Sequence, residues 1–218
     1  MASKFKNITG IVLGTRDIKD YDKMLIILSP EVGKLHLMVY GANRFKSRFS
    51  NKINNANIIK GFIRYPNSLD KLPSIEDIEI LVDFFGELKK NNFKLMIVNF
   101  ITEITNLVVP IEVFDEEIYN LIIRALQELT EKDNENDNFN TLTKFCISLL
   151  KNQGILPFIK TETLSDKTKR YVIRVMKGNY PDEVGKEIKL EFLEWFSRKI
   201  STIIPKKIIS IEMLNYFI

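Results

Sequence analysis

The segment DKMLIILSPEVGKLHLMVYG, residues 22–41, decides the fold of the first part of the chain. It contains two apolar runs on either side of Pro30 to Gly33, a pattern typical of a β-hairpin with a short turn. Three further β-rich segments surround it: NITGIVLGTRD, NANIIKGFIRY and LPSIEDIEILV. A glycine inside a strand often marks a bulge, so we expect the first strand to bend at Gly14. Five short strands with a coiled first strand predict an OB-fold barrel in residues 1–82, although a split sheet would share this pattern.

The remainder of the chain, residues 83–218, changes to a helical period. Apolar residues recur at spacings of three and four in residues 93–107, 118–129 and 139–150. Ser165 is expected to cap a further helix that ends near Gly178, and residues 192–203 and 208–217 predict two more. The acidic, amide-rich segment EKDNENDNFN, residues 131–140, predicts a loop between helices. The predicted class is therefore α+β, with an N-terminal OB-fold DNA-binding domain (1–82) and an α-helical domain (83–218).

Composition excludes several classes of function. The 218 residues include one cysteine, Cys146, and one histidine, His36, so no intrachain disulfide can form. A zinc site built from Cys and His needs about four ligands, so we expect no metal, and nothing else indicates a cofactor. No apolar run reaches the roughly 18 residues of a membrane span, and the start lacks the core of a signal peptide. We therefore expect a cytoplasmic protein with no membrane partner.

No catalytic motif is apparent. The sequence contains neither G-x-x-x-x-G-K-[ST] nor G-x-G-x-x-G, the two glycine-rich patterns that bind phosphates. Paired carboxylates such as Asp20 with Asp22 are ordinary in turns and at helix starts. We expect a non-enzymatic protein, although a metal-dependent nuclease built from scattered Asp and Glu residues stays open.

Charge is distributed unevenly. Residues 32–69 hold seven cations and no acid in 38 residues, whereas residues 112–137 are strongly acidic. The basic run centres on YGANRFKSRFSNKI, residues 40–53, where Phe45 and Phe49 lie among cations. Binding of nucleic acid through such a loop would be mostly electrostatic and would weaken with salt. The two phenylalanines would either stack on bases or anchor the loop to the barrel. An ordinary solvated loop is the alternative.

Four segments resemble the RecO family of bacterial recombination mediators. They are IVLGTRDIKDYDKMLIILSPEVGKLHLMVYGANRFKSR (11–48), KFCISLLKNQGILP (144–157), LSDKTKRYVIRVM (164–176) and PKKIISIEMLNYF (205–217). The family often carries a four-cysteine zinc finger after the second segment. Here only residues 158–164 separate Pro157 from Ser165, so the chain resembles a member that lacks the finger.

This resemblance implies a recombination and repair protein at the bacterial nucleoid. Such proteins bind single- and double-stranded DNA, anneal complementary strands, and with the partner RecR help to load RecA onto strands coated by single-strand-binding protein. The phosphate contacts it implies are Lys34, Arg44, Lys46, Arg48 and Lys52. The C-terminal tail of single-strand-binding protein would bind near Lys144, and Arg124 is added to this site by composition alone. Two alternatives stay open: a general OB-fold nucleic-acid binder without these partners, and a structural helical adaptor.

A second basic surface is possible on the predicted helix after Ser165. Its cations are Lys167, Lys169, Arg170, Arg174 and Lys177.

Overall fold

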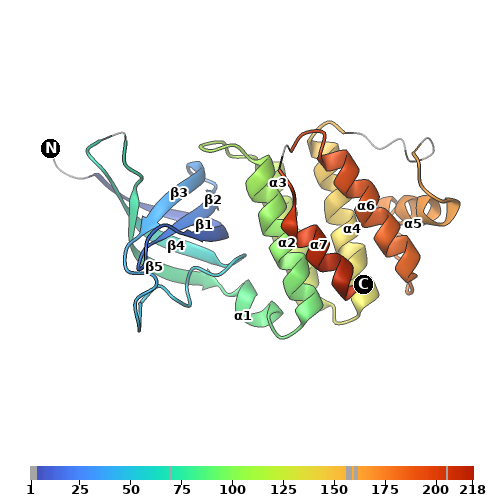
Figure 1. Cartoon of the computed structure of the whole chain (residues 1–218), viewed down its shortest axis with the longest axis horizontal. Coiled ribbons are helices and arrows are strands. Elements are labelled where there is room, and N and C mark those ends of the chain that lie inside the picture. Colours follow the sequence, from blue (N-terminus) through green and yellow to red (C-terminus); the bar gives the residue numbers. More distant parts are fainter. Residues whose placement is uncertain (1–3, 69, 156–158, 160–161, 205) are drawn as a thin grey trace. The chain divides into compact units, whose positions relative to one another are not determined.

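The computed structural model describes residues 4–68, 70–155, 159, 162–204 and 206–218. Five strands precede the helices in this part of the chain (Figure 1). The strands are β1 (Lys4–Asp17), β2 (Lys23–Ser29), β3 (Gly33–Val39), β4 (Ile58–Tyr65) and β5 (Ser74–Val82). The helices are α1 (Phe84–Leu88), α2 (Asn92–Val108), α3 (Glu116–Glu131), α4 (Glu135–Asn152), α5 (Asp166–Met176), α6 (Lys186–Ile200) and α7 (Ile209–Phe217).

The chain forms two compact units. The first unit contains residues 1–87 and 102–119, and the second contains residues 88–101 and 120–218. Helix α2 thus contributes its first part to the second unit and its last part to the first. The predicted domain boundary at residue 82 stays a prediction, and each unit is described below by itself.

The strands of the first unit form a closed barrel in the order β1-β2-β3-β5-β4. All neighbouring pairs are antiparallel except β3 with β5, which close the barrel in parallel at Met38 and Ser74. The predicted OB-type barrel followed by helices is confirmed. The register of β1 against β2 shifts between Val12 and Gly14, which confirms the bend expected at this glycine.

The barrel interior follows the period of two that strands impose. Leu25 and Ile27 of β2 and Leu35, Leu37 and Val39 of β3 belong to one buried core. The alternate residues of β2, Met24, Ile26 and Leu28, are also buried. This explains why β2 reads as a continuous apolar run and not as an alternating strand.

Residues 109–114 lie beside β3 in the first unit. The amide of Lys34 donates to the carbonyl of Val113 at 3.1 Å, and the amide of Glu112 donates to the carbonyl of Lys34 at 2.8 Å. Gly33 permits this approach because its φ is +76° and a Cβ there would lie 2.6 Å from the carbonyl carbon of Val113. Part of the outward side of β3 is therefore already covered.

The second unit is held together by aromatic side chains of its helices. Phe100 of α2 packs edge-on against Phe145 of α4 and Phe196 of α6. Phe139 of α4 does the same with Phe192 of α6. All five rings are essentially buried, which is the expected stabilising core of a helical domain.

The N-termini of α5 and α4 can be compared with the predictions from the sequence. Ser165 caps α5 as predicted, because its hydroxyl accepts the amide of Thr168 at 3.3 Å. The loop predicted for residues 131–140 is confirmed only for residues 132–134 and is wrong for the rest, since α4 already begins at Glu135 with Asn134 as its cap. The acids that suggested a loop, Glu135 and Asp137, lie in the first helical turn, where the helix dipole favours negative charge.

No described helix combines the length and the apolar composition that a membrane span requires. No three His, Cys, Asp or Glu side chains of the described residues gather closely enough to hold a metal ion.

Candidate nucleic-acid interface

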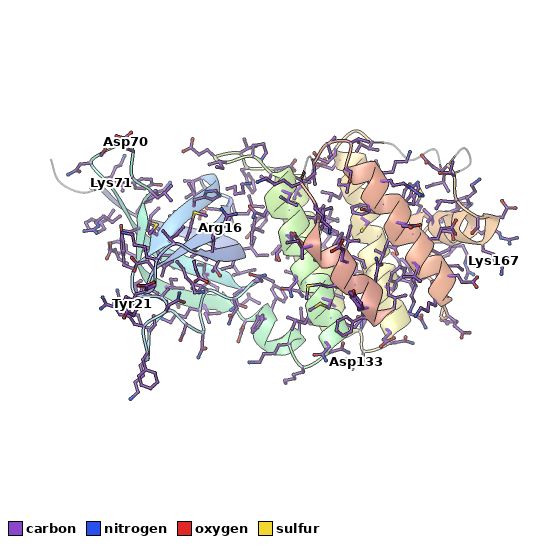
Figure 2. The ribbon with its side chains drawn as sticks, viewed as in Figure 1. Arg16, Tyr21, Asp70, Lys71, Asp133 and Lys167 are labelled. Carbon is purple, nitrogen blue, oxygen red and sulfur yellow. The ribbon has the colours of Figure 1, made fainter. Side chains whose placement is uncertain are left out.

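The loop between β3 and β4, residues 40–57, is fastened at its start to the turn between β1 and β2. The amide of Gly41 donates to Asp22 Oδ1 at 2.8 Å, and the amide of Asn43 donates to the carbonyl of Tyr21 at 3.0 Å. Figure 2 labels Tyr21 at this turn. The side chain of Asn43 donates to Asp17 Oδ1 at 2.9 Å. This hydrogen bond, followed by that of Lys23, lowers the pKa of the Asp17 carboxyl.

A second anchor holds the end of the same loop. Phe49 and Ile53 are only 4% and 6% exposed and belong to the barrel core. The amide of Ala56 then donates to the carbonyl of Val12 at 2.8 Å, and the amide of Val12 donates to the carbonyl of Asn57 at 2.9 Å. Of the two roles open for the phenylalanines, Phe49 is an anchor. Phe45 differs completely, because 92% of its surface is exposed.

Four predicted contact residues lie together on this loop. Arg44, Lys46 and Arg48 are exposed, whereas Lys52 is half-buried. The guanidinium of Arg44 lies 5.7 Å from the ring centre of Tyr21, and Lys46 Nζ lies 5.5 Å from that of Phe45. Such cation–π contacts orient a cation without neutralising it.

The other two loop cations reach the barrel. One guanidinium nitrogen of Arg48 donates to the carbonyl of Glu76 at 2.6 Å, and Lys52 Nζ donates to that of Ile78 at 2.5 Å. Among the described residues, no carboxylate forms an ion pair with any of the four loop cations. The loop therefore presents a local excess of positive charge, which is the electrostatic requirement for binding phosphates.

The fifth predicted contact, Lys34, lies elsewhere. It is 6% exposed on β3, and its ammonium donates to the carbonyl of Asn106 at 2.7 Å. Asn106 belongs to the last turn of α2, where carbonyls lack helical partners and a cation is favourable. The position of Lys34 is that of a structural cap inside the first unit.

The two residues predicted for the partner site, Arg124 of α3 and Lys144 of α4, line one small hollow. Its volume is about 70 Å³, and Leu121, Ala125 and Phe145 add apolar surface to it. Arg124 is exposed. Lys144 instead forms an ion pair with Glu128, which also pairs with Lys132 at 3.3 Å.

Glu128 and Lys144 shift each other's pKa in opposite directions. Burial by itself would raise the pKa of the Glu128 carboxyl, but the ammonium groups of Lys144 and Lys132 outweigh it and hold that pKa below its ordinary value. Burial would likewise lower the pKa of Lys144, but the Glu128 carboxylate raises it. A partner carboxylate that contacts Lys144 must therefore compete with Glu128.

Helix α5 carries the second basic surface. Its exposed cations Lys167, Arg170 and Arg174, with Lys177 at its C-cap, follow one another at spacings of three, four and three residues, so they share a face. Figure 2 labels Lys167 on this helix. Lys169 lies on another side, half-buried, where its charge helps to lower the pKa of Glu162.

The chain is similar in sequence to known proteins. Residues 1–82 match the family model described as "Recombination protein O N terminal". The resemblance to the RecO family is confirmed. DNA repair protein RecO of Symbiobacterium thermophilum is 26% identical over 151 residues, which cover 69% of this chain and 57% of that protein. DNA repair protein RecO of Gloeothece citriformis is 27% identical over 160 residues, which cover 71% and 53%.

A RecO protein of Mycoplasma mycoides has higher identity over a shorter alignment. It is 32% identical over 139 residues, which cover 61% of this RecO-like chain and 51% of that protein. The aligned part of the chain thus spans about half the length of its curated relatives.

Sequence reasoning missed the residues that hold the loop in place. Tyr21, Asp22 and Asn43 position the basic segment, and the pattern of charges gave no signal for them. Asp22 was interpreted as an ordinary turn carboxylate, whereas it accepts the amide of Gly41.

Proposed function

We propose that this chain acts in DNA repair as a RecO-like recombination mediator. In this role it binds single- and double-stranded DNA, anneals complementary strands, and with RecR helps to load RecA onto strands coated by single-strand-binding protein. Such a protein would work in the bacterial cytoplasm at the nucleoid. The relationship to RecO proteins supports the repair role. The observation that carries the DNA-binding part is the anchored loop of residues 40–57, whose cations form no ion pair with any carboxylate that the structure describes.

In this proposal Arg44, Lys46 and Arg48 contact phosphates, and Lys52 supports them from the base of the loop. The exposed guanidinium and ammonium groups attract the backbone of either strand type without reading bases. Screening the repulsion between two phosphate backbones is what strand annealing requires. Lys34 is left out of the contact set, because its ammonium is buried on the carbonyl of Asn106.

Fluorescence anisotropy with labelled single- and double-stranded DNA at several salt concentrations tests this. A variant with Arg44→Glu, Lys46→Glu and Arg48→Glu is expected to lose affinity by roughly two orders of magnitude or more, and its salt slope should fall by roughly 2–3. The control is Lys90→Glu with Lys151→Glu and Lys186→Glu, which changes the net charge equally at three exposed positions outside the loop. Equal losses in both variants would show that net charge alone matters and would contradict the proposal.

We also propose that the acidic tail of single-strand-binding protein binds at the hollow lined by Arg124 and Lys144. Arg124 is exposed, and the hollow combines a cation with apolar walls, which suits an acidic peptide that ends in an apolar residue. The expected result is that Lys144→Glu and Arg124→Glu each weaken binding of a tail peptide. Unchanged binding in both variants would remove this partner from the proposal.

A nucleic-acid-binding protein without mediator partners is the second candidate. It is favoured by one observation, the ion pair in which Glu128 already engages Lys144. The two candidates differ in the Glu128→Gln variant. A mediator should bind the tail peptide more tightly once Lys144 is released, whereas the second candidate binds the peptide in neither form.

A further inference from the structure

Phe45 lies in a position that packing does not explain. It is 92% exposed, while Phe49, four residues later in the same loop, is 4% exposed in the barrel core. Apolar side chains of this size normally gain free energy by burial, and this one gains almost none within the first unit. The loop also does not need Phe45 as an anchor, because Phe49 and Ile53 supply that contact.

The backbone on both sides of Phe45 has a defined conformation and is held by hydrogen bonds and packing. Gly41 has a φ of +73°, and Lys46, directly after Phe45, has a φ of +60°. A lysine in this left-handed region is uncommon, and such local strain concentrates at functional sites. The residues on both sides are fixed, by Asp22 and Tyr21 before Phe45 and by the core after it. Phe45 is therefore displayed by a loop whose two ends are held.

The positive charges around the Phe45 ring favour single-stranded nucleic acid as its binding partner. Arg44, Lys46 and Arg48 flank Phe45, and Lys46 Nζ lies 5.5 Å from the ring centre. Here an exposed aromatic ring lies between cations that form no ion pair with any described carboxylate. This combination matches the two contacts that single-stranded nucleic acid offers, a base face and a phosphate. A duplex offers its phosphates to the same cations but keeps its bases stacked.

Other places for bases on the barrel are less suitable. OB-folds bind oligonucleotides across strands 2 and 3, but here the outward residues Ile26, Leu28 and Lys34 are already buried. Phe5 and Phe62 are exposed, yet their rings stack on each other at 5.0 Å, and Phe62 pairs across the sheet with Asp77. A carboxylate beside that ring repels phosphates, whereas among the described residues no carboxylate forms an ion pair with Arg44, Lys46 or Arg48 around Phe45.

We propose that Phe45 stacks on a base of single-stranded nucleic acid while Arg44, Lys46 and Arg48 contact the adjacent phosphates. This inference rests on the proposed function of the loop and adds a preference for single strands over duplexes. It assigns Phe45 as a binding residue without sequence specificity, because every base has a face on which a ring can stack.

The experiment compares Phe45→Ala and Phe45→Trp with the wild type by fluorescence anisotropy. The probes are a labelled oligothymidylate, an abasic strand with the same number of phosphates, and a duplex of the same length. Phe45→Ala is expected to weaken oligothymidylate binding roughly five- to a hundredfold and to leave the abasic strand and the duplex unchanged. Phe45→Trp should retain the wild-type affinities.

A second measurement uses the tryptophan that Phe45→Trp introduces. Its fluorescence should be quenched by oligothymidylate and not by the abasic strand, after subtraction of the buried Trp195 signal measured in the wild type. Equal losses of affinity for thymidylate and abasic strands in Phe45→Ala would overturn stacking, as would no loss for either.

The experiments distinguish failure of the phosphate-binding role of the loop from failure of the stacking role of Phe45. If the variant with Arg44→Glu, Lys46→Glu and Arg48→Glu binds DNA like the wild type, the phosphate-binding function of the loop is wrong. If that variant loses binding but Phe45→Ala does not distinguish thymidylate from the abasic strand, only the stacking role is wrong.

Discussion

The β3–β4 loop and helix α5 are both rich in cations, but they hold them differently. On the loop, Arg44 and Lys46 lie over aromatic rings and Arg48 and Lys52 donate to carbonyls of β5. On α5, Lys167, Arg170, Arg174 and Lys177 make no ion pair with any described residue. They form the polar side of a helix that buries Tyr171, Val172 and Val175 on the other. A basic helix face is thus the ordinary result of amphipathicity.

The number of cations alone is therefore a poor guide to a binding surface. A cation that is already held in place loses less conformational entropy when a phosphate binds it. The loop cations are oriented without being neutralised, whereas no ion pair with a described residue orients the α5 cations. We therefore expect the loop to dominate DNA binding.

The largest effect should come from breaking the anchor of the loop. Phe49→Ala removes a buried ring from the barrel core and should lower the free energy of unfolding by about 3–5 kcal/mol. Chemical denaturation followed by circular dichroism measures this. Phe45→Ala is the matched control, and it should change the stability by less than about 0.5 kcal/mol because its ring is exposed. Similar losses in the two variants would contradict the assignment of separate roles.

The next effect concerns a cation that belongs to neither basic surface. Lys34→Ala removes the charged hydrogen bond to the carbonyl of Asn106, so stability should fall by about 1.5–3 kcal/mol. Under conditions where the variant is folded, its DNA affinity should equal that of the wild type. A clear loss of affinity in the folded variant would return Lys34 to the phosphate-contact set.

Charge reversal on α5 directly compares the contribution of this helix to DNA binding with that of the loop. Lys167→Glu with Arg170→Glu and Arg174→Glu changes the net charge as much as the loop variant does. We expect a loss of DNA affinity below about tenfold, which corresponds to less than about 1.4 kcal/mol. Anisotropy titrations at matched salt measure it. A loss as large as that of the loop variant would show that orientation of the cations is unimportant.

The smallest expected effect is the change with pH in the stability that the Glu128–Lys144 ion pair contributes. The folded pKa of Glu128 lies below its ordinary value of 4.5, so its contribution to stability is present above that pH and is lost as pH falls through the folded value. The folded pKa of Lys144 lies above 10.5, so its contribution is present below that pH and is lost as pH rises through the folded value.

Wild type and Glu128→Gln should therefore differ in stability most between these two limits. The pair is partly exposed, so the difference should be on the order of 1 kcal/mol or less. Denaturation midpoints measured from pH 3 to pH 8 check it, and a difference that grows on acidification would contradict the assigned direction.

Local patterns in the sequence were enough to predict most of the secondary structure. The apolar and β-rich runs, the turn at Pro30 to Gly33 and the glycine at position 14 predicted the strands and the bulge, because these signals depend on neighbouring residues. The Ser165 cap was predictable for the same reason. The loop prediction for residues 131–140 extended too far, because acids and amides are common in loops and also in the first turn of a helix.

Which side chains are exposed and unpaired enough to bind a partner depends on the tertiary fold. Lys34 is buried because Asn106 lies beside it, 72 residues away in the sequence. Phe49 is buried and Phe45 exposed although both lie among cations, because the fold directs one ring into the barrel and leaves the other outside. Lys144 is engaged by Glu128 of a neighbouring helix. Exposure and pairing depend on contacts between segments that are distant in the sequence, and no local pattern carries that information.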